Sequence, residues 1–114
     1  MDLSLREKQS LFAQLLYKFL KKVYGLGYEV TLGEAYRTKE QAAWNAEKGI
    51  GIKNSLHCLR LAIDLNVFKD GKYLSKTADL LPLGEVWESM HELATWGGRF
   101  GDGNHFSLTH GGRR

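Results

Sequence analysis

The sequence lacks the features that stabilise small secreted domains and those that insert a chain into a membrane. Its 114 residues contain a single cysteine and a single proline, so neither an intramolecular disulfide nor a thiolate zinc cluster can form. No apolar run approaches the ~20 residues that span a bilayer. Residues 1–8 lack the cationic start and apolar core of a signal peptide. We therefore expect a chain that is synthesised in the cytoplasm and does not insert into a membrane.

A large excess of one charge is also missing. Lys and Arg number 16 and Asp and Glu number 13, which gives a net charge of +3. This balance does not indicate a nucleic-acid-binding protein, although it favours contact with an anionic polymer. The length suits one domain over residues 1–114, and nothing in the sequence predicts an oligomer, so we expect a monomer.

Helical patterns are present in three segments. Apolar residues at three- and four-residue steps predict an amphipathic helix over about residues 4–24, with Ser4 and Glu7 as a capping box. A second helix is expected over 39–48, capped by Thr38 and ended by the glycines at 49 and 51. A third is expected over 83–96, before Gly97-Gly98.

Extended patterns lie between and after these helices. The expected strands cover 28–36, 61–68 and 105–108, and a hairpin through 69–72 leads to a short partner at 73–74. The tail over 109–114 is expected to fray. Helices and strands mix without a regular βαβ repeat, so the sequence predicts an α+β domain in which helices flank a small antiparallel sheet.

The strongest chemical signal comes from two histidines and an aspartate. His57 and His105 lie where predicted loops meet strands, and Asp64 interrupts an apolar strand. Alternation along the strand would let Asp64 simply face solvent, but a metal ion would explain it better. Two imidazoles and a carboxylate are typical of catalytic zinc, which keeps a fourth position for water. Asp102, in a glycine-rich segment just before His105, is placed to act as a general base.

Chain geometry sets a condition on this site. Seven residues of straight strand cover ~23 Å, whereas two ligands of one zinc ion lie a few ångströms apart. The chain must therefore reverse between His57 and Asp64, and we expect the turn near Leu59-Arg60.

Other residues of the same types support weaker alternatives. His91-Glu92 begins a metalloprotease HExxH motif, but Thr95 stands where the second histidine is needed. Glu88 and His91 form half of a di-iron motif that occurs once, where two copies are required. We interpret Glu85, Glu88, His91 and Glu92 as an exposed helix face. Outside that helix, Cys58 is interpreted as a small buried thiol rather than a nucleophile, and His110 as a tail residue.

Three segments together resemble a known family. They are Ser55-x-His57-x-x-Arg60-x-Ala62-x-Asp64, the downstream run 102–106 (DGNHF) and the upstream run 34–41 (EAYRTKEQ). In this order and spacing they are similar to the zinc D-alanyl-D-alanine carboxypeptidases and phage L-alanyl-D-glutamate endopeptidases. The resemblance covers about residues 30–108, is strongest to small phage-type enzymes, and implies a fold like that of DD-peptidases and the Hedgehog signalling domain.

The resemblance implies a role for each matching residue. His57, Asp64 and His105 would bind one Zn²⁺ per chain, and Asp102 would be the catalytic base. Arg37 would bind substrate or stabilise the oxyanion. The alternative without a role in catalysis is a surface salt bridge between Arg37 and Glu34 or Glu40. Ser55 would lie on the substrate side or support a ligand. The family usually has glycine at the position of Arg60, so the conformation of the predicted turn is the main departure.

The implied function is hydrolysis of peptidoglycan stem peptides. The first hypothesis is an L-alanyl-D-glutamate endopeptidase that acts as a phage or prophage endolysin. It would be made in the host cytoplasm and reach the wall through a permeabilised membrane. A close alternative is a D,D- or L,D-carboxypeptidase. An alternative of another class is a non-catalytic binding domain stabilised by zinc, which would have no need for a base at Asp102.

Overall fold

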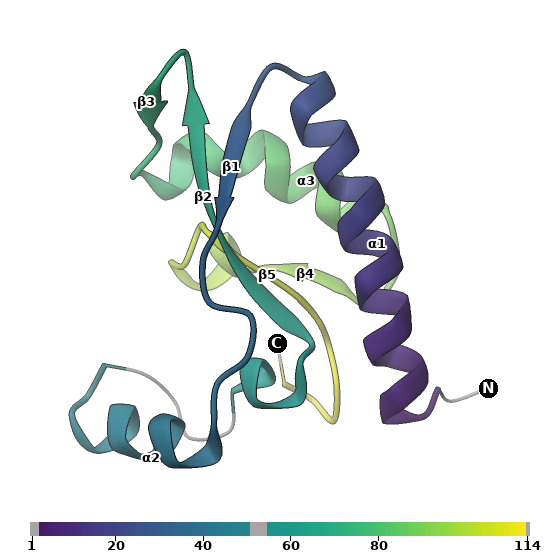
Figure 1. Ribbon diagram of the computed structural model, residues 1–114, viewed down its shortest axis with the longest axis vertical. Coiled ribbons are helices and arrows are strands. Elements are labelled where there is room, and N and C mark those ends of the chain that lie inside the picture. Colours follow the sequence, from purple (N-terminus) through teal and green to yellow (C-terminus); the bar gives the residue numbers. More distant parts are fainter. Residues whose placement is uncertain (1–2, 51–54, 114) are drawn as a thin grey trace.

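An antiparallel sheet of five strands organises the chain in the computed structural model, which describes residues 3–50 and 55–113 (Figure 1). The strands run in the order β1-β2-β5-β4, and β3 pairs with β2. Their bounds are β1 Glu29–Leu32, β2 Ala62–Lys69, β3 Lys72–Tyr73, β4 Ala94–Trp96 and β5 His105–Leu108. The helices are α1 Leu5–Gly25, α2 Lys39–Glu47 and α3 Leu81–Ser89, with short 3-10 helices η1 Leu56–Leu59, η2 Thr77–Leu80 and η3 Gly97–Phe100. The predicted α+β class is confirmed.

The first helix forms as its sequence predicts. The Ser4 hydroxyl accepts from the Glu7 backbone N–H at 3.1 Å, and the Glu7 carboxylate accepts from the Ser4 N–H at 2.9 Å. This reciprocal cap satisfies two N–H groups that the helix leaves without partners. One face of α1 packs on the sheet and α3 through four buried side chains, Phe12, Leu15, Phe19 and Val23.

Aromatic side chains join α1, α3 and β5 at the centre of the core. The Trp87 ring of α3 contacts Phe12 and Phe19 edge-on, with centroid distances of 5.8 and 5.2 Å. Phe106 of β5 lies 5.0 Å from Phe19. The Trp87 indole N–H donates to the Ser107 carbonyl at 3.1 Å, so this large side chain is buried without an unsatisfied donor.

The predicted hairpin is present, and β2 is its longer strand. Asp70 and Gly71 turn the chain with φ of 51° and 77°, the two positive values that a type I′ turn requires. The first predicted strand is shorter than expected, because only Glu29–Leu32 pairs with β2. Residues 33 and 34 still follow β2 through single hydrogen bonds: Gly33 N–H donates to the Asp64 carbonyl at 2.8 Å, and Asp64 N–H donates to that of Glu34 at 2.9 Å.

The C-terminal third differs most from the prediction. The third helix ends at Ser89, and residues 94–96, expected to be helical, form strand β4 against β5. Alternation decides this: Ala94 and Trp96 are buried on one side while Thr95 is partly exposed. The tail does not fray as far as Arg113, because His110 and Arg113 exchange backbone hydrogen bonds and Lys8 contacts Thr109 and His110. Residue 114, like Gly51, lies outside the described residues.

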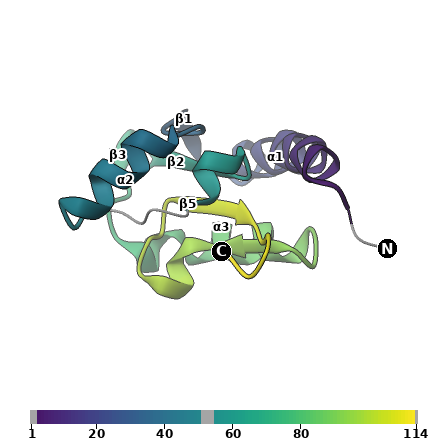
Figure 2. The same ribbon diagram turned by 90° about the horizontal axis from the view of Figure 1, so that it is seen from below.

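The second helix stands at the side of the molecule remote from α1, as both ribbon views show (Figures 1 and 2). Thr38 caps α2 as predicted, accepting from the Gln41 N–H at 3.0 Å. Ala42 is the one residue of α2 that is fully buried. No helix in the described part of the chain is long and apolar enough to cross a membrane.

Candidate metal centre

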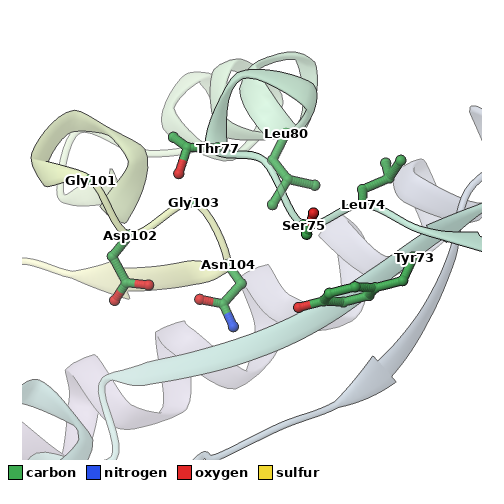
Figure 3. Close-up of a pocket in the computed structure, with 9 residues that line it drawn as sticks. All are labelled: Tyr73, Leu74, Ser75, Thr77, Leu80, Gly101, Asp102, Gly103 and Asn104. Atoms are coloured by element: carbon green, nitrogen blue, oxygen red, sulfur yellow. The ribbon is translucent and has the colours of Figure 1, made fainter. Parts of the chain in front are cut away.

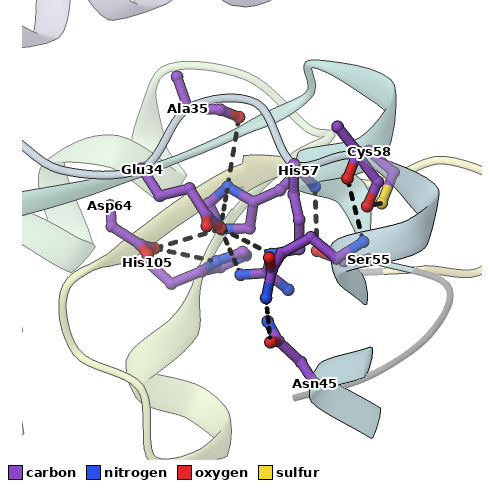
Figure 4. Close-up of polar contacts among 11 residues, drawn as sticks. Glu34, Ala35, Asn45, Ser55, His57, Cys58, Asp64 and His105 are labelled. Atoms are coloured by element: carbon purple, nitrogen blue, oxygen red, sulfur yellow. Dashed lines mark hydrogen bonds and ion pairs between the residues drawn. The ribbon is translucent and has the colours of Figure 1, made fainter. Parts of the chain in front are cut away.

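His57, Asp64 and His105 converge from three elements, as the sequence predicted. They lie in η1, β2 and β5, and one candidate ligand atom from each lies within 4.8 Å of the other two. Asp64 Oδ1 is 3.3 Å from His57 Nε2 and 3.6 Å from His105 Nδ1 (Figure 4). Both histidines are buried, and Asp64 is partly buried. The group is close enough to bind a metal ion.

The reversal that brings His57 to Asp64 occurs at Arg60. Arg60 follows η1 with φ 56° and ψ 36°, in the left-handed region. Glycine reaches this conformation without strain, whereas a residue with a Cβ does so at a cost. The Arg60 guanidinium stacks over the Tyr36 ring at 4.0 Å from its centroid, a cation–π contact that offsets part of this cost. The turn predicted at Leu59-Arg60 is therefore present, with arginine in a glycine-like conformation.

A backbone carbonyl orients the His57 ring. His57 Nδ1 lies 3.3 Å from the Ala35 carbonyl oxygen, and the tautomer that donates Nδ1–H to this oxygen leaves the Nε2 lone pair facing Asp64. A lone pair and a carboxylate oxygen that face each other repel unless a cation or a proton lies between them. This arrangement is typical of a histidine prepared for a metal ion.

Two polar atoms of the group lack hydrogen bonds. Within the described residues, the buried Asp64 Oδ1 and His105 Nε2 have no hydrogen-bond partner. Such atoms are rare in folded proteins and call for an explanation, of which a bound ion is one. Burial raises the pKa of Asp64, whereas protons on the facing nitrogens of His105 and His57 lower the pKa by more. In the tautomer that leaves a lone pair facing Asp64, a metal cation would take the place of such a proton and keep the carboxylate ionised.

Strand pairing and a glycine place His105. It stands directly opposite Asp64 in the β2–β5 ladder. Gly97 of η3 packs against it so closely that a Cβ at this position would lie 2.3 Å from the Asp102 carbonyl oxygen and 2.6 Å from His105 Cβ. The Asp102 N–H donates to the Gly97 carbonyl at 2.8 Å, and the His105 N–H contacts the Asp102 carbonyl at 3.2 Å. The glycine-rich segment thus lets the loop fold tightly beside His105 and Asp64.

Asp102 lies beside this group and lines a small polar cavity. The cavity has a volume of about 180 Å³ and lies between residues 73–80 and the loop 101–104 (Figure 3). Its lining includes the side chains of Tyr73, Ser75, Thr77 and Asn104. Partial burial raises the pKa of Asp102, and the charge of Asp64 adds to the rise. A raised pKa suits a carboxylate that must accept and release a proton.

Arg37 is engaged by Glu34 in this structure. Its Nε donates to Glu34 Oε1 at 2.8 Å, and its Nη2 contacts the same oxygen. The salt bridge with Glu34 considered as the alternative for Arg37 is therefore present, with the Arg37 side chain 14% exposed and that of Glu34 37% exposed. Glu34 Oε1 also lies 3.7 Å from His57 Nδ1. Sequence reasoning gave Glu34 no role at the site beyond pairing with Arg37, although its position three residues before Arg37 is visible in the sequence.

Ser55 supports the backbone of His57. It is buried, and its hydroxyl accepts from the His57 N–H at 3.1 Å as the cap of η1. Cys58 is only half-buried, and its thiol contacts the Thr38 carbonyl at 3.8 Å (Figure 4). The expected buried thiol is therefore only partly buried.

The residues assigned to an exposed helix face are distributed differently. Glu88 is half-buried, accepts from the Trp96 N–H at 3.1 Å and pairs with Arg99 at 2.8 Å. The hydrogen bond to Arg99 lowers the pKa of Glu88. His91 and Glu92 lie beyond the end of α3, where His91 Nδ1 accepts from the Leu93 N–H at 3.0 Å. Of the four, Glu85 is exposed on α3 and Glu92 is exposed beyond its end.

Comparison with known proteins adds no relative. No family model matches the chain. No curated protein is significantly similar to it. What can be said of its function depends on the chemistry of the His57, Asp64 and His105 group and on the residues around it.

Proposed function

We propose that this chain is a zinc-dependent peptidase that cuts the stem peptides of peptidoglycan, at the bond between L-alanine and D-glutamate. The observation that carries the proposal is the convergence of His57, Asp64 and His105 on a buried Asp64 Oδ1 that has no hydrogen-bond partner among the described residues. Two imidazoles and one carboxylate suit zinc, and three protein ligands leave a position for water or substrate. The resemblance of the motifs around these residues supports the choice of peptidase.

Zinc bound at this site would polarise the scissile carbonyl and acidify a water molecule. Asp102 would accept the proton of the attacking water and return it to the nitrogen of the leaving amine. Its position in the chain supports this role, because its backbone is hydrogen-bonded to Gly97 and His105 while no hydrogen bond within the described residues holds its carboxylate. The adjoining polar cavity gives room for part of the substrate beside the base.

Arg37 would meet the negative charge of the substrate or of the oxyanion. Its guanidinium carries five N–H donors, and Glu34 engages only part of this fork. The Glu34 pair would hold the guanidinium in one orientation, and the remaining donors could bind a carboxylate or an oxyanion.

Mass spectrometry of purified peptidoglycan digested with the zinc-loaded protein tests the proposal. New L-alanine carboxyl and D-glutamate amino termini are expected. Release of a terminal D-alanine instead would identify a carboxypeptidase. A zinc-binding protein that yields no new termini from walls of any stem-peptide composition would be a binding domain, and the peptidase proposal would be wrong.

A further inference from the structure

Trp44 of α2 is exposed, unlike the two other tryptophans. Trp87 is 0% exposed and Trp96 is 2% exposed, whereas Trp44 is 50% exposed. The two buried indoles donate to the carbonyls of Ser107 and Gly103. Within residues 3–50 and 55–113, the Trp44 indole N–H has no hydrogen-bond partner. The ring therefore contributes little to the core and offers both an apolar face and a free donor to solvent.

The exposed ring forms one wall of a second pocket. This pocket has a volume of about 330 Å³ and is lined by Thr38, Glu40, Gln41 and Trp44. It combines one aromatic face with a hydroxyl, a carboxylate and an amide, and none of the described residues that line it is a cation. The Gln41 amide is oriented in advance, because its Nε2 donates to Asn45 Oδ1 at 2.7 Å. Lys48 Nζ lies 5.7 Å from the Trp44 ring centroid and covers one face of the indole.

The pocket is linked to the metal centre by a short segment. The Arg37 N–H donates to the His57 carbonyl at 3.2 Å, and the next residue, Thr38, is both a wall of the pocket and the cap of α2. Thr38 also contacts Cys58 of η1 through its carbonyl. Trp44 lies six residues beyond Thr38, which is ~9 Å along a helix. A ligand in this pocket would therefore lie next to a substrate bound at the metal.

The chemistry of the lining selects an uncharged ring rich in hydroxyl groups. A pyranose presents a face of C–H groups that can stack on indole, and its rim of hydroxyls pairs with amide, carboxylate and hydroxyl side chains. A peptide stem is a poorer match, because it has no hydroxyl-rich ring to stack on the indole and its acidic groups would meet the Glu40 carboxylate, although Lys48 lies over the Trp44 ring. Under the proposed function, the substrate is a stem peptide attached to a sugar of the glycan strand. A sugar would therefore lie beside a stem peptide that is bound at the metal.

We infer that the pocket of Thr38, Glu40, Gln41 and Trp44 binds a sugar residue of the glycan strand, with Trp44 as the stacking platform. This inference rests on the proposed function for its substrate. It implies that the protein favours stem peptides that are still attached to glycan over free peptides.

Binding of a peptide-free sugar tests the inference independently of hydrolysis. The probe is a β-1,4-linked tetramer of N-acetylglucosamine, titrated into the zinc-loaded protein while tryptophan fluorescence and its quenching by acrylamide are followed. Because Trp87 and Trp96 are buried, the change reports on Trp44. Saturable protection of the fluorescence is expected in the wild-type protein and in Tyr17→Ala, which removes an exposed aromatic on α1. Trp44→Ala and Trp44→Phe lack the reporting indole, so their binding is measured by titration calorimetry, with loss expected in the first and partial retention in the second. No saturable binding to the wild-type protein would overturn the inference.

Kinetics provide the second arm. Trp44→Ala should raise KM for intact peptidoglycan by about tenfold, the size of a lost stacking contact, and leave kcat and the hydrolysis of a sugar-free stem peptide unchanged. An equal rise in KM on both substrates would mean that the pocket binds peptide, and the inference would be wrong. Sugar binding without hydrolysis of either substrate would support the sugar pocket and refute the peptidase. Hydrolysis without sugar binding would support the peptidase and refute the sugar pocket.

Discussion

Asp64 and His105 face each other directly across the β2–β5 ladder, with Oδ1 and Nδ1 3.6 Å apart. Strand register alone therefore sets this half of the metal centre, because a shift by one residue would turn either side chain to the other face of the sheet. The other half depends on η1, which carries His57 and is joined to β2 through the left-handed Arg60. A substitution that disturbs the pairing of β2 with β5 should therefore displace Asp64 and His105, whereas one that disturbs the Arg60 turn should displace His57.

The first prediction concerns metal content. We expect about one zinc per chain, and loss of it in His57→Ala and in His105→Ala, since each removes one of three ligands. His110→Ala, outside the site, should keep its zinc. Removal of zinc with a chelator should lower the Tm of the wild-type protein, because an ion that binds only the folded state stabilises that state. The stabilisation is ~2.7 kcal/mol when the free zinc concentration is 100 times Kd. Full zinc retention in both ligand variants, measured by atomic absorption, would refute the ligand assignment.

The second prediction separates the base from the ligands. Asp102→Ala should keep zinc and Tm close to the wild-type values, since its carboxylate makes no hydrogen bond within the described chain, and should lower hydrolysis by ~10²–10⁴. The rate of release of new termini from peptidoglycan is the measurement. Undiminished activity with normal zinc content would place the base on another residue.

The convergence of His57, Asp64 and His105 was predictable because their chemistry shows in single residues. An aspartate within an apolar strand and a histidine after a glycine-rich segment stand out against their neighbours, and the need for a turn near Leu59-Arg60 followed from the length of a strand. The extent of the third helix was not predictable in the same way. Residues 83–96 contain good helix formers as far as Trp96, but pairing with β5 and burial of Ala94 and Trp96 outweigh that local preference.

The contacts that hold His57 and the Arg60 turn in place also could not be predicted from the sequence. The Ala35 carbonyl that orients His57, like the stacking of Arg60 on Tyr36, depends on how the segment 33–38 folds against η1. These contacts join residues more than twenty positions apart and involve a backbone atom or a surface pair. Neither contact produces a residue spacing or a residue type in the sequence from which it could be predicted.

The third prediction tests the turn at Arg60. Arg60→Gly removes the strain of a positive φ but also the contact with Tyr36, so its free energy of unfolding should stay within ~1 kcal/mol of wild type. Arg60→Ala loses the contact and keeps the strain, and should be less stable than Arg60→Gly. Urea unfolding of the zinc-free proteins measures both. Equal stability of the two variants would show that the left-handed conformation is not what the position demands.

The fourth prediction concerns the glycine beside His105. The methyl group of Gly97→Ala would meet the Asp102 carbonyl and His105 Cβ at 2.3 and 2.6 Å, so the loop must shift. We expect a loss of ~1–3 kcal/mol in stability and weaker zinc binding. Gly25→Ala is the matched control, because a Cβ there meets nothing within 4 Å and alanine favours the end of α1. Zinc affinity of Gly97→Ala equal to that of Gly25→Ala would contradict the proposed close packing.

The fifth prediction concerns pH and the C-terminal turn. His110 Nδ1 lies 3.0 Å from Lys8 Nζ, so a neutral imidazole accepts from the ammonium group, whereas a protonated one repels it. Burial, then the charges of Lys8 and Arg113, lower the pKa of His110 below its usual ~6.5. The unfolded chain therefore binds this proton more readily than the folded one. The stability contributed by neutral His110 is fully present above about pH 6.5 and is lost as the pH falls through the lowered folded-state pKa.

His110→Asn should flatten this part of the pH profile, because asparagine can accept from Lys8 but does not titrate. The measurement is urea unfolding at pH 8 and pH 5 with chelator present, so that zinc binding does not contribute. All other groups are the same in both proteins, so the comparison isolates residue 110. The wild-type protein should lose more stability than the variant between the two pH values. Equal losses would mean that the contact between His110 and Lys8 does not persist in solution, and that the tail is as loosely held as its glycine-rich sequence suggests.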